Sequence, residues 1–506
     1  MNVQTLPSDL PAAHNRIVSL EHRVVYLEEQ LRLTRAKFFG RSSEKRPLEA
    51  SEAQMLLFDA APDADVPLPP KKEKISYERN ERRGISGNLP EGTRFPEHLP
   101  RRDEIIDEGE GEVRFVKITE RLAADKSPFY VKRIIRRIRR QDGSLVSPPV
   151  PPAVLERTSV DISFLVYVLM AKYVWHLPLY RQEQMLKAQG ISISRDTLIR
   201  YVIALAELLK PIYVVLGATL FSGDHLFADE TPVLVGKRDR ERKRYSESWY
   251  WAFLGESGCA FYNAPSRAFK EVEPLLSSFS GHLQIDGYNV YEKLAKEYPQ
   301  ITLVSCWAHA RRKFVDAEKG GNAPEASNAL RYIRALYRVE ERIRDRELKP
   351  PEILHLRQRF TKKILLLFAR WLKARAQDPT LLPKSLFGKA VGYTLKRWES
   401  LGRYADEPML AIDSNAVERE IRPIALGKKN WLFCASEVGA EASAIVYSLI
   451  ASCRLADIDP AEYLTDVIER ISVHPASKVE KLIPVNWKLL REQEKKTADA
   501  LAPHAA

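Results

Sequence analysis

The chain has 506 residues, 45% of them hydrophobic and 29% charged, which is typical of a globular protein with about three or four domains. Its formal net charge of +12 favours a polyanionic partner, either nucleic acid or an anionic membrane surface. No apolar run approaches the roughly 18 residues that span a bilayer, and the first residues lack the pattern of a signal peptide. We therefore expect a cytoplasmic protein that binds nucleic acid and no membrane.

Residues 1–45 predict a long amphipathic helix. Its apolar residues recur at alternating spacings of three and four, which is a heptad seam over about three repeats. The seam consists of Ile17, Leu20, Val24, Leu27, Leu31 and Phe38. We expect a coiled coil that makes the protein a homo-oligomer. The alternative is one helix packed on its own domain, because so short a coil is only marginally stable alone.

Residues 46–100 are rich in Pro, Lys, Glu and Arg and predict a basic linker. Residues 101–155 predict a small β-rich module that contains a basic strand. We expect an apolar side with Val131, Ile134, Ile135 and Ile138, and a basic side with Lys132, Arg133, Arg136 and Arg137. The basic side is either a solvated strand face or a contact to the DNA backbone.

Residues 156–218 predict a helical DNA-binding domain with a helix-turn-helix pattern. Gly190 suits the turn, and Ser194 suits the N-cap of the second helix. Arg195, Thr197 and Arg200 would face outward at the start of that helix, where they are candidates for DNA contact. Helix pairs of this shape also occur in proteins that never bind DNA, so the alternative stays open.

Residues 219–320 predict the first part of a catalytic core. From about residue 225 the order is three strands, a helix and two strands, which is the order of a ribonuclease-H-like core. Asp229 lies within the first strand and Asp286 ends the fourth, 57 positions later (286 − 229). These strands are neighbours in that fold, so the two carboxylates would share a site. Taken singly, Asp229 is equally a cap or turn residue, and Asp286 equally opens the turn before Gly287.

Residues 321–404 predict a helical insertion, 405–450 the second part of the core, and 451–506 a C-terminal helical region. Glu418 falls in the first turn of a helix that starts near Asn415, and Arg422 lies one turn later on the same face. Asn415 and Glu418 also have the spacing of a capping box, which is the structural alternative. As a third carboxylate, Glu418 would complete a site for two Mg²⁺ or Mn²⁺ ions about 3.5–4 Å apart, an arrangement that hydrolyses phosphodiesters.

These elements predict a multidomain α+β protein. Its expected parts are an N-terminal coiled-coil helix, a small β-rich module, a helical DNA-binding domain and a ribonuclease-H-like α/β core with a helical insertion.

Eight segments, in this order, resemble the insertion-sequence-66 family of transposases, a branch of the DDE superfamily. They are LRLTRAKFFGRSSEK, KYVWHLPLYRQEQMLKAQGISISRDTL, FADETPV, QIDGYNVY, CWAHARRKF, IDSNAVEREIRPIALGKKNWLF, SLIASCRLADIDPAEYLTDVI and LIPVNW. The resemblance implies that Asp229, Asp286 and Glu418 form the catalytic, metal-binding triad. It also implies a place near the DNA or the active site for His309, Arg311, Arg312, Arg422, Lys428 and Lys429. His309 is alternatively a structural histidine.

The sequence departs from the family at two places. Residues 101–155 contain no cysteine, although the family usually has a zinc-binding module there, so zinc is not expected. Ser414 stands where the family commonly has Asn, and serine still suits a helix start.

The resemblance implies the movement of an insertion sequence. The protein would bind terminal inverted repeats, cleave the DNA ends and join them to target DNA, with accessory proteins of the same element as further partners. The alternatives are a metal-dependent nuclease without strand transfer and a non-catalytic DNA-binding protein.

Overall fold

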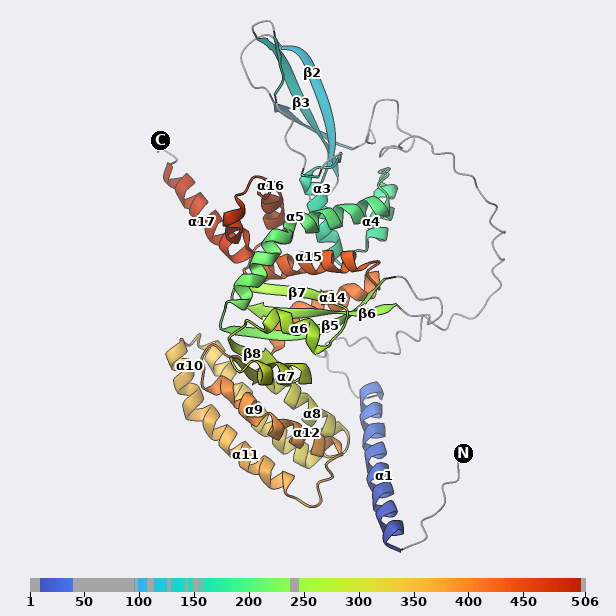
Figure 1. Ribbon diagram of the computed structural model, residues 1–506, viewed down its shortest axis with the longest axis vertical. Coiled ribbons are helices and arrows are strands. Elements are labelled where there is room, and N and C mark those ends of the chain that lie inside the picture. The colour runs from blue at the N-terminus through green and yellow to red at the C-terminus, as the bar shows by residue number, and fades with distance from the viewer. Residues whose placement is uncertain are drawn as a thin grey trace, which may run out of the picture. The chain divides into compact units, whose positions relative to one another are not determined.

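The computed structural model describes residues 10–39, 95, 99–106, 113–124, 129–141, 144–148, 154–155, 158–236 and 245–501 (Figure 1). Most of the predicted linker 46–100 therefore lies outside the described residues. The chain divides into two compact units. Unit 1 comprises Met1–Arg83, Arg311–Ile333 and Phe368–Leu395, and unit 2 comprises Gly84–Ala310, Arg334–Leu367 and Lys396–Ala506.

Unit 1 is helical where the structure describes it. It contains α1 (Leu10–Phe39) and large parts of α8 (Trp307–Lys319), α9 (Ala323–Asp345), α11 (Lys362–Ala376) and α12 (Leu386–Lys396). Aromatic rings from four of these helices pack together as Phe314, Tyr332, Phe368, Trp371 and Phe387. These rings form an aromatic cluster within unit 1.

The helix predicted within residues 1–45 is confirmed as α1, which is anchored in unit 1 through a polar face. Glu29 is buried, and its carboxylate accepts hydrogen bonds from Asn322 Nδ2 (2.6 Å) and from the backbone N of Leu386 (2.9 Å) at the start of α12. The heptad seam lies elsewhere on the helix. Its members Ile17, Leu20, Val24, Leu27 and Leu31 are 51–55% exposed. The coiled coil itself stays a prediction.

Unit 2 is built around a mixed sheet in the order β7-β6-β5-β8-β9. The strands are β5 (His225–Val235), β6 (Ser246–Gly255), β7 (Gly258–Ala264), β8 (Gly281–Ile285) and β9 (Ile301–Ser305), with α6 (Phe269–Leu276) and α7 (Asn289–Glu297) between them in sequence. β6 is antiparallel to β5 and β7, whereas β8 is parallel to β5 and β9. The predicted pairing of the first strand with the fourth is confirmed.

Two long apolar helices, α5 (Arg195–Phe221) and α15 (Glu437–Leu455), pack against each other and against β7 (Figure 1). Both are long and apolar enough to cross a bilayer, which corrects the expectation that no apolar run approaches this length. The apolar window of α15 is 72% buried inside the protein and that of α5 44%, so burial in the core accounts for much of their composition.

Two serines of α15 complete the hydrogen bonding of the edge strand β7. Ser448 Oγ accepts from the backbone N of Phe261 (2.9 Å), and Ser452 Oγ accepts from that of Cys259 (3.0 Å). β7 lies at the end of the sheet, where unpaired backbone groups would otherwise be buried without partners. The helix therefore fixes the sheet by polar as well as apolar contacts.

The predicted succession of helix, turn and helix is present. It follows α3 (Ile162–Tyr173) and consists of α4 (Leu179–Ala188), a turn and α5. Gly190 has a φ of 76° in the turn, a conformation that favours glycine. Ser194 is the N-cap of α5, and its hydroxyl accepts from the backbone N of Thr197 (3.2 Å).

Within 101–155, the described strands form the expected small β-sheet, in the order β1-β3-β2 with β4 paired to β3. The strands are β1 (Arg101–Ile106), β2 (Val113–Ala123), β3 (Tyr130–Gln141) and β4 (Ser144–Val146). The expectation of one apolar side on β3 is wrong, because neighbouring side chains on a strand point to opposite faces. Ile134 is buried, whereas Ile135 shares the other face with Ile118, which is 49% exposed.

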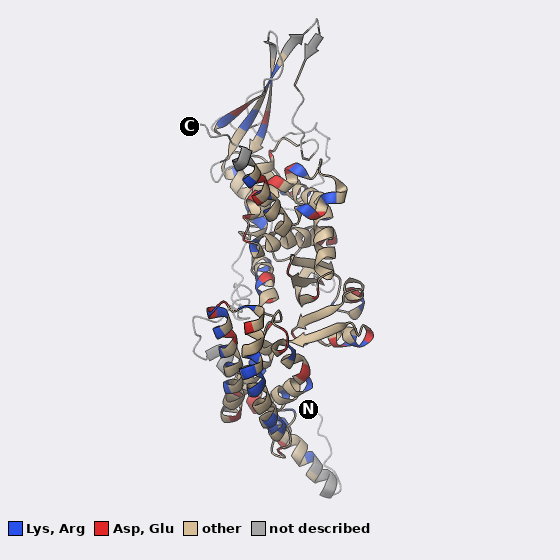
Figure 2. Cartoon of the chain, turned by 90° about the vertical axis from the view of Figure 1, so that its left-hand side faces the viewer, with Lys and Arg blue, Asp and Glu red and all other residues tan. Residues whose placement is uncertain are grey.

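Basic candidates on β3 contact other residues within this part of unit 2. Lys132 forms an ion pair with Glu104 (2.7 Å), and Arg133 forms one with Asp103 (3.5 Å). Arg136, expected on an outward basic side, is buried and donates to the carbonyl of Pro148 (3.1 Å). Figure 2 shows acidic and basic residues side by side on these strands. Acidic neighbours thus offset part of the positive charge of β3.

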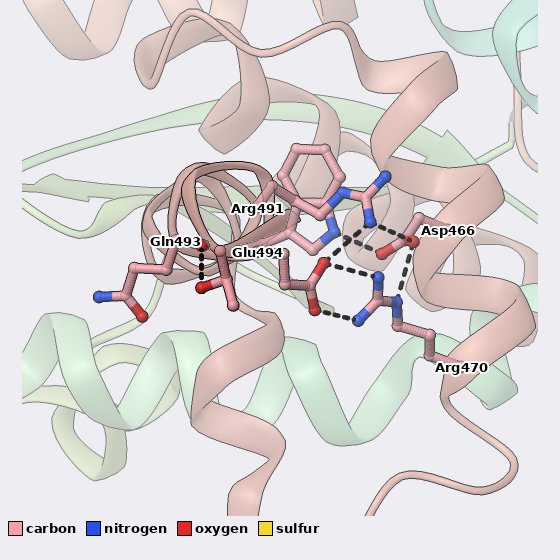
Figure 3. A network of polar contacts seen from close by, with 7 residues as sticks. Asp466, Arg470, Arg491, Gln493 and Glu494 are labelled. Carbon is pink, nitrogen blue, oxygen red and sulfur yellow. Dashed lines mark hydrogen bonds and ion pairs between the residues drawn. The ribbon is translucent and has the colours of Figure 1, made fainter. Parts of the chain in front are cut away.

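The remaining elements of the described chain are five further helices and three short π or 3-10 segments. They are α10 (Pro350–Leu356), a π-helical turn (Arg357–Thr361), α13 (Trp398–Gly402), two 3-10 helices (Arg403–Ala405 and Ala476–Leu482), α14 (Asn415–Trp431), α16 (Pro460–Arg470) and α17 (Pro484–Leu501). A network of ion pairs joins α16 to α17 (Figure 3). Arg470 contacts Asp466 and Glu494, both at 2.9 Å, and Arg491 contacts Glu494 at 2.9 Å.

Candidate active site

Two carboxylates meet where β5 and β8 run side by side. The parallel register pairs His225 with His282 and continues to Phe227 with Gln284. Extending that register by two residues brings Asp229 level with Asp286, which directly follows the end of β8. Level residues on paired strands point to the same face of the sheet. The predicted strand pairing thus puts the two residues at corresponding positions, whereas their role as a catalytic pair stays a prediction.

The electrostatic environment of Asp229 ties it to the other acidic residues. Burial raises the pKa of this carboxyl well above its usual value of 3.8, and the negative charges of Glu230, Asp286 and Glu418 raise the pKa further. A hydrogen bond from the backbone N of Glu230 (2.8 Å) opposes this only in part. Asp229 is thus linked electrostatically to each of the other two predicted carboxylates.

Glu418 reaches this group from the start of α14, which packs against β5. The helix has Ser414 as its N-cap and Asn415 as its first residue. A capping box would then require a Glu at position 417, where the chain has Val417, so the capping-box alternative is wrong. Glu418 Oε1 instead lies 3.7 Å from Nδ1 of His309, near the start of α8.

A second buried acidic residue, which the sequence did not point to, lies beside the first. Glu230 is 1% exposed at its side chain and forms a close ion pair with Arg267. Tyr291 donates its hydroxyl proton to Glu230 Oε2 (3.2 Å). Burial and the charge of Asp286 raise the pKa of Glu230, while Arg267 lowers it. Arg267 lies far along the chain, in a loop without a recognisable motif, so no sequence signal pairs it with Glu230.

Arg267 also contacts the turn that carries Asp286. Its guanidinium lies 4.1 Å from the ring centre of Tyr288 and 4.5 Å from that of Trp249, which are cation–π distances. The Tyr288 hydroxyl donates to the carbonyl of Arg267 (2.9 Å), and the Tyr288 backbone N donates to Asp286 Oδ1 (2.8 Å). Aromatic and cationic groups therefore order one side of the site.

The donor chemistry of the site fits a hard divalent cation. Carboxylate oxygens are the ligands that Mg²⁺ and Mn²⁺ prefer. Within the described ranges, no three acidic, histidine or cysteine side chains are close enough together to hold one ion. A divalent cation held by these carboxylates therefore stays a prediction.

The other predicted contact residues are distributed over several helices. Arg195 and Arg200 are exposed at the start of α5, with Arg200 donating to Thr197 Oγ1 (3.1 Å). In unit 1, Arg311 and Arg312 are exposed on α8.

Three predicted cations lie on α14. Arg422 and Lys429 are exposed. Lys428 is half-buried and donates to Thr231 Oγ1 (3.1 Å) and to the carbonyl of Pro232 (2.6 Å) on β5. Lys428 thus ties α14, and with it Glu418, to the strand of Asp229.

Comparison with known proteins identifies the family. Residues 157–442, more than half of the chain, match "Transposase IS66 family", residues 448–485 match "IS66 C-terminal element", and residues 26–103 match "Transposase C of IS166 homeodomain". Two relatives come from Sinorhizobium fredii (strain NBRC 101917 / NGR234). "Uncharacterized protein y4jD" is 30% identical over 96% of this chain and 98% of its own length. "Uncharacterized protein y4hP" is 29% identical over 93% of this chain and 89% of its own length. The chain therefore belongs to the IS66 family of transposases.

Proposed function

We propose that this protein is the transposase of an insertion sequence, which binds terminal inverted repeats, cleaves the DNA ends and transfers the strands to target DNA. We assign its five-stranded sheet to a ribonuclease-H-like core of the DDE superfamily. The observation that carries the proposal is the register of β5 and β8, which brings Asp229 level with Asp286. Family membership supplies the class of reaction.

In this proposal Asp229, Asp286 and Glu418 hold two Mg²⁺ or Mn²⁺ ions. Bound there, the ions would activate a water or a 3′ hydroxyl and stabilise the charged leaving oxygen. The carboxylate of Asp229 is partly buried and lies among other negative charges. A bound cation would therefore stabilise its charged form. His309 restrains the carboxylate of Glu418 from 3.7 Å away. Arg422, exposed one turn beyond Glu418, offers positive charge to a phosphate.

The proposed partner is DNA. Arg195 and Arg200 are exposed at the start of α5. In a helix-turn-helix motif, the residues that contact DNA lie in the same position, near the N-terminus of the second helix. Exposed cations at Arg311, Arg312 and Lys429 would add contacts to phosphates, which depend on charge rather than sequence. We further propose a homo-oligomer joined through the exposed seam of α1, located in the cytoplasm and assisted by accessory proteins of the same element.

The test uses labelled DNA carrying the element ends, together with target DNA and Mg²⁺. The wild-type protein should cut the ends and form joined products. Asp229→Asn should bind the ends with unchanged affinity and give no cut, because the basic surfaces remain while the metal site is lost. Asp345→Asn, which removes an exposed carboxylate from α9, is the matched control and should behave as wild type.

Two other outcomes would contradict parts of this proposal. Normal cutting by Asp229→Asn would remove the residue from the catalytic site. Cutting by the wild-type protein without joined products would identify a nuclease instead of a transposase.

A further inference from the structure

The turn that carries Asp286 is unusually well connected for three residues at the end of a strand. Gly287 has a φ of 101°, in the region that favours glycine. Its carbonyl accepts a hydrogen bond from Arg397 Nη2 at 2.8 Å. The residues on either side are held by the Tyr288 backbone N donating to Asp286 Oδ1 (2.8 Å). Arg397 is 110 positions away in sequence, so this contact is a product of the fold.

Arg397 itself is firmly placed. It lies between α12 and α13, and its side chain is 10% exposed. Its guanidinium forms a close ion pair with Glu292, in the first turn of α7, and Lys396 contacts the same carboxylate at 2.7 Å. Arg397 therefore bridges the carbonyl of Gly287 and the helix that follows the turn. A guanidinium can do both because its donors form a planar fork.

The charges of the site explain why such a bridge is needed. The negative charges of Asp286 and Glu418 both act on Asp229, and all three are carboxylates. Like charges repel, so these charges favour a movement of Asp286 away from Asp229. The glycine at position 287 gives the backbone little resistance of its own, because glycine has the widest choice of conformations. A restraint on the Gly287 carbonyl opposes this movement.

We propose that Arg397 is a positioning residue that holds the turn of Asp286 against the repulsion of the site, so that the carboxylates stay ready for a divalent cation. The proposal rests on the function proposed above. Arg397 does not contact the reacting atoms; it acts through the backbone of Gly287. The role of Glu292 is to keep the guanidinium aimed at that carbonyl.

The test measures Mn²⁺ binding directly, by calorimetry on the full-length protein without DNA. Arg397→Gln should raise the dissociation constant for Mn²⁺ about 10- to 100-fold, the usual effect of removing a group that supports a metal ligand. Arg397→Lys keeps one donor and should recover part of the affinity. Arg397 lines a hollow of about 540 Å³ beside β9, so the substitutions fit without displacing neighbours.

The matched control is Arg470→Gln, in the network between α16 and α17 (Figure 3). Like Arg397→Gln, this substitution removes a guanidinium that is paired with a carboxylate. It should lower the melting temperature while leaving the Mn²⁺ dissociation constant unchanged. In DNA cleavage, Arg397→Gln should need more Mn²⁺ for half-maximal rate yet approach the wild-type rate at saturation, which a general loss of structure would not produce.

The outcomes separate the two proposals. If Asp286→Asn binds Mn²⁺ as tightly as wild type, the metal site itself is wrong. If Asp286→Asn loses binding but Arg397→Gln binds normally, the site stands and the positioning role of Arg397 is refuted. An equal loss of Mn²⁺ affinity in Arg470→Gln would also refute it, because the effect would then follow from stability alone.

Discussion

Replacing Asp229 by Asn should stabilise the protein in the absence of metal, although it destroys the proposed catalytic site. Burial first, and then the charges of Glu230, Asp286 and Glu418, raise the pKa of Asp229 well above 3.8. The unfolded chain therefore releases this proton more readily than the folded protein does. Each unit by which folding raises the pKa destabilises the folded state by about 1.4 kcal/mol at neutral pH.

The pH dependence gives this prediction its sign. The pKa of Asp229 is higher in the folded protein than in the unfolded chain. Its contribution to the free energy of unfolding of the wild-type protein is therefore fully present below about pH 3.8 and is lost as pH rises through the folded pKa. Asparagine does not titrate, so the free energy of unfolding of the variant should increase relative to that of the wild type as pH rises. The gain in the free energy of unfolding should be larger at pH 7 than at pH 4 and should also appear as a higher melting temperature.

Urea unfolding at pH 4, 5.5 and 7 in the presence of a chelator measures the effect. Asp345→Asn, at an exposed carboxylate, should show no comparable gain at any pH. Adding Mg²⁺ at about 100 times its dissociation constant should stabilise wild type by about 2.7 kcal/mol and the variant by much less. If the variant is no more stable than wild type at pH 7, or if its gain in the free energy of unfolding is the same at pH 4, then repulsion between the carboxylates does not destabilise the wild-type protein.

Two further predictions concern other parts of the structure. Arg267→Met should destabilise the protein by about 3–5 kcal/mol in urea unfolding, because it leaves the buried carboxylate of Glu230 without its cation. The double variant with Glu230→Gln should recover most of that loss, and no recovery would mean that the ion pair is not its cause. Deletion of residues 1–45 should lower the molecular mass in light scattering, because the seam of α1 is exposed. Leu20→Glu with Leu27→Glu should do the same, and an unchanged mass in both would contradict self-association through α1.

The sequence predicted the elements around the site well because periodicity carried the information. The strands from His225 to Ser305 are short apolar runs separated by turn residues, and their order along the chain limits the ways they can pair. The strand order was therefore sufficient to predict that Asp229 and Asp286 lie on neighbouring strands. Ser194 and Gly190 were equally predictable, since caps and left-handed turns restrict residue type locally.

Contacts between distant side chains were not predictable in this way. Neither Arg267 nor Arg397 belongs to a motif, and each finds its partner only through the fold. The capping-box spacing at Asn415 was misleading because the helix starts one residue earlier in register than the pattern implied. On β3, apolar residues at positions 131, 134, 135 and 138 have helical spacing, which a strand divides between two faces.

The position of Glu418 in the chain has a consequence for synthesis. The ribosome must add 132 residues after Asp286 (418 − 286) before the third carboxylate exists. A nascent or prematurely terminated chain that ends in the helical region carries α4, α5 and two of the three acids, but no complete triad. Under the proposed function, such a product lacks the third metal ligand and would not cut DNA, so interrupted synthesis would not release an unfinished nuclease.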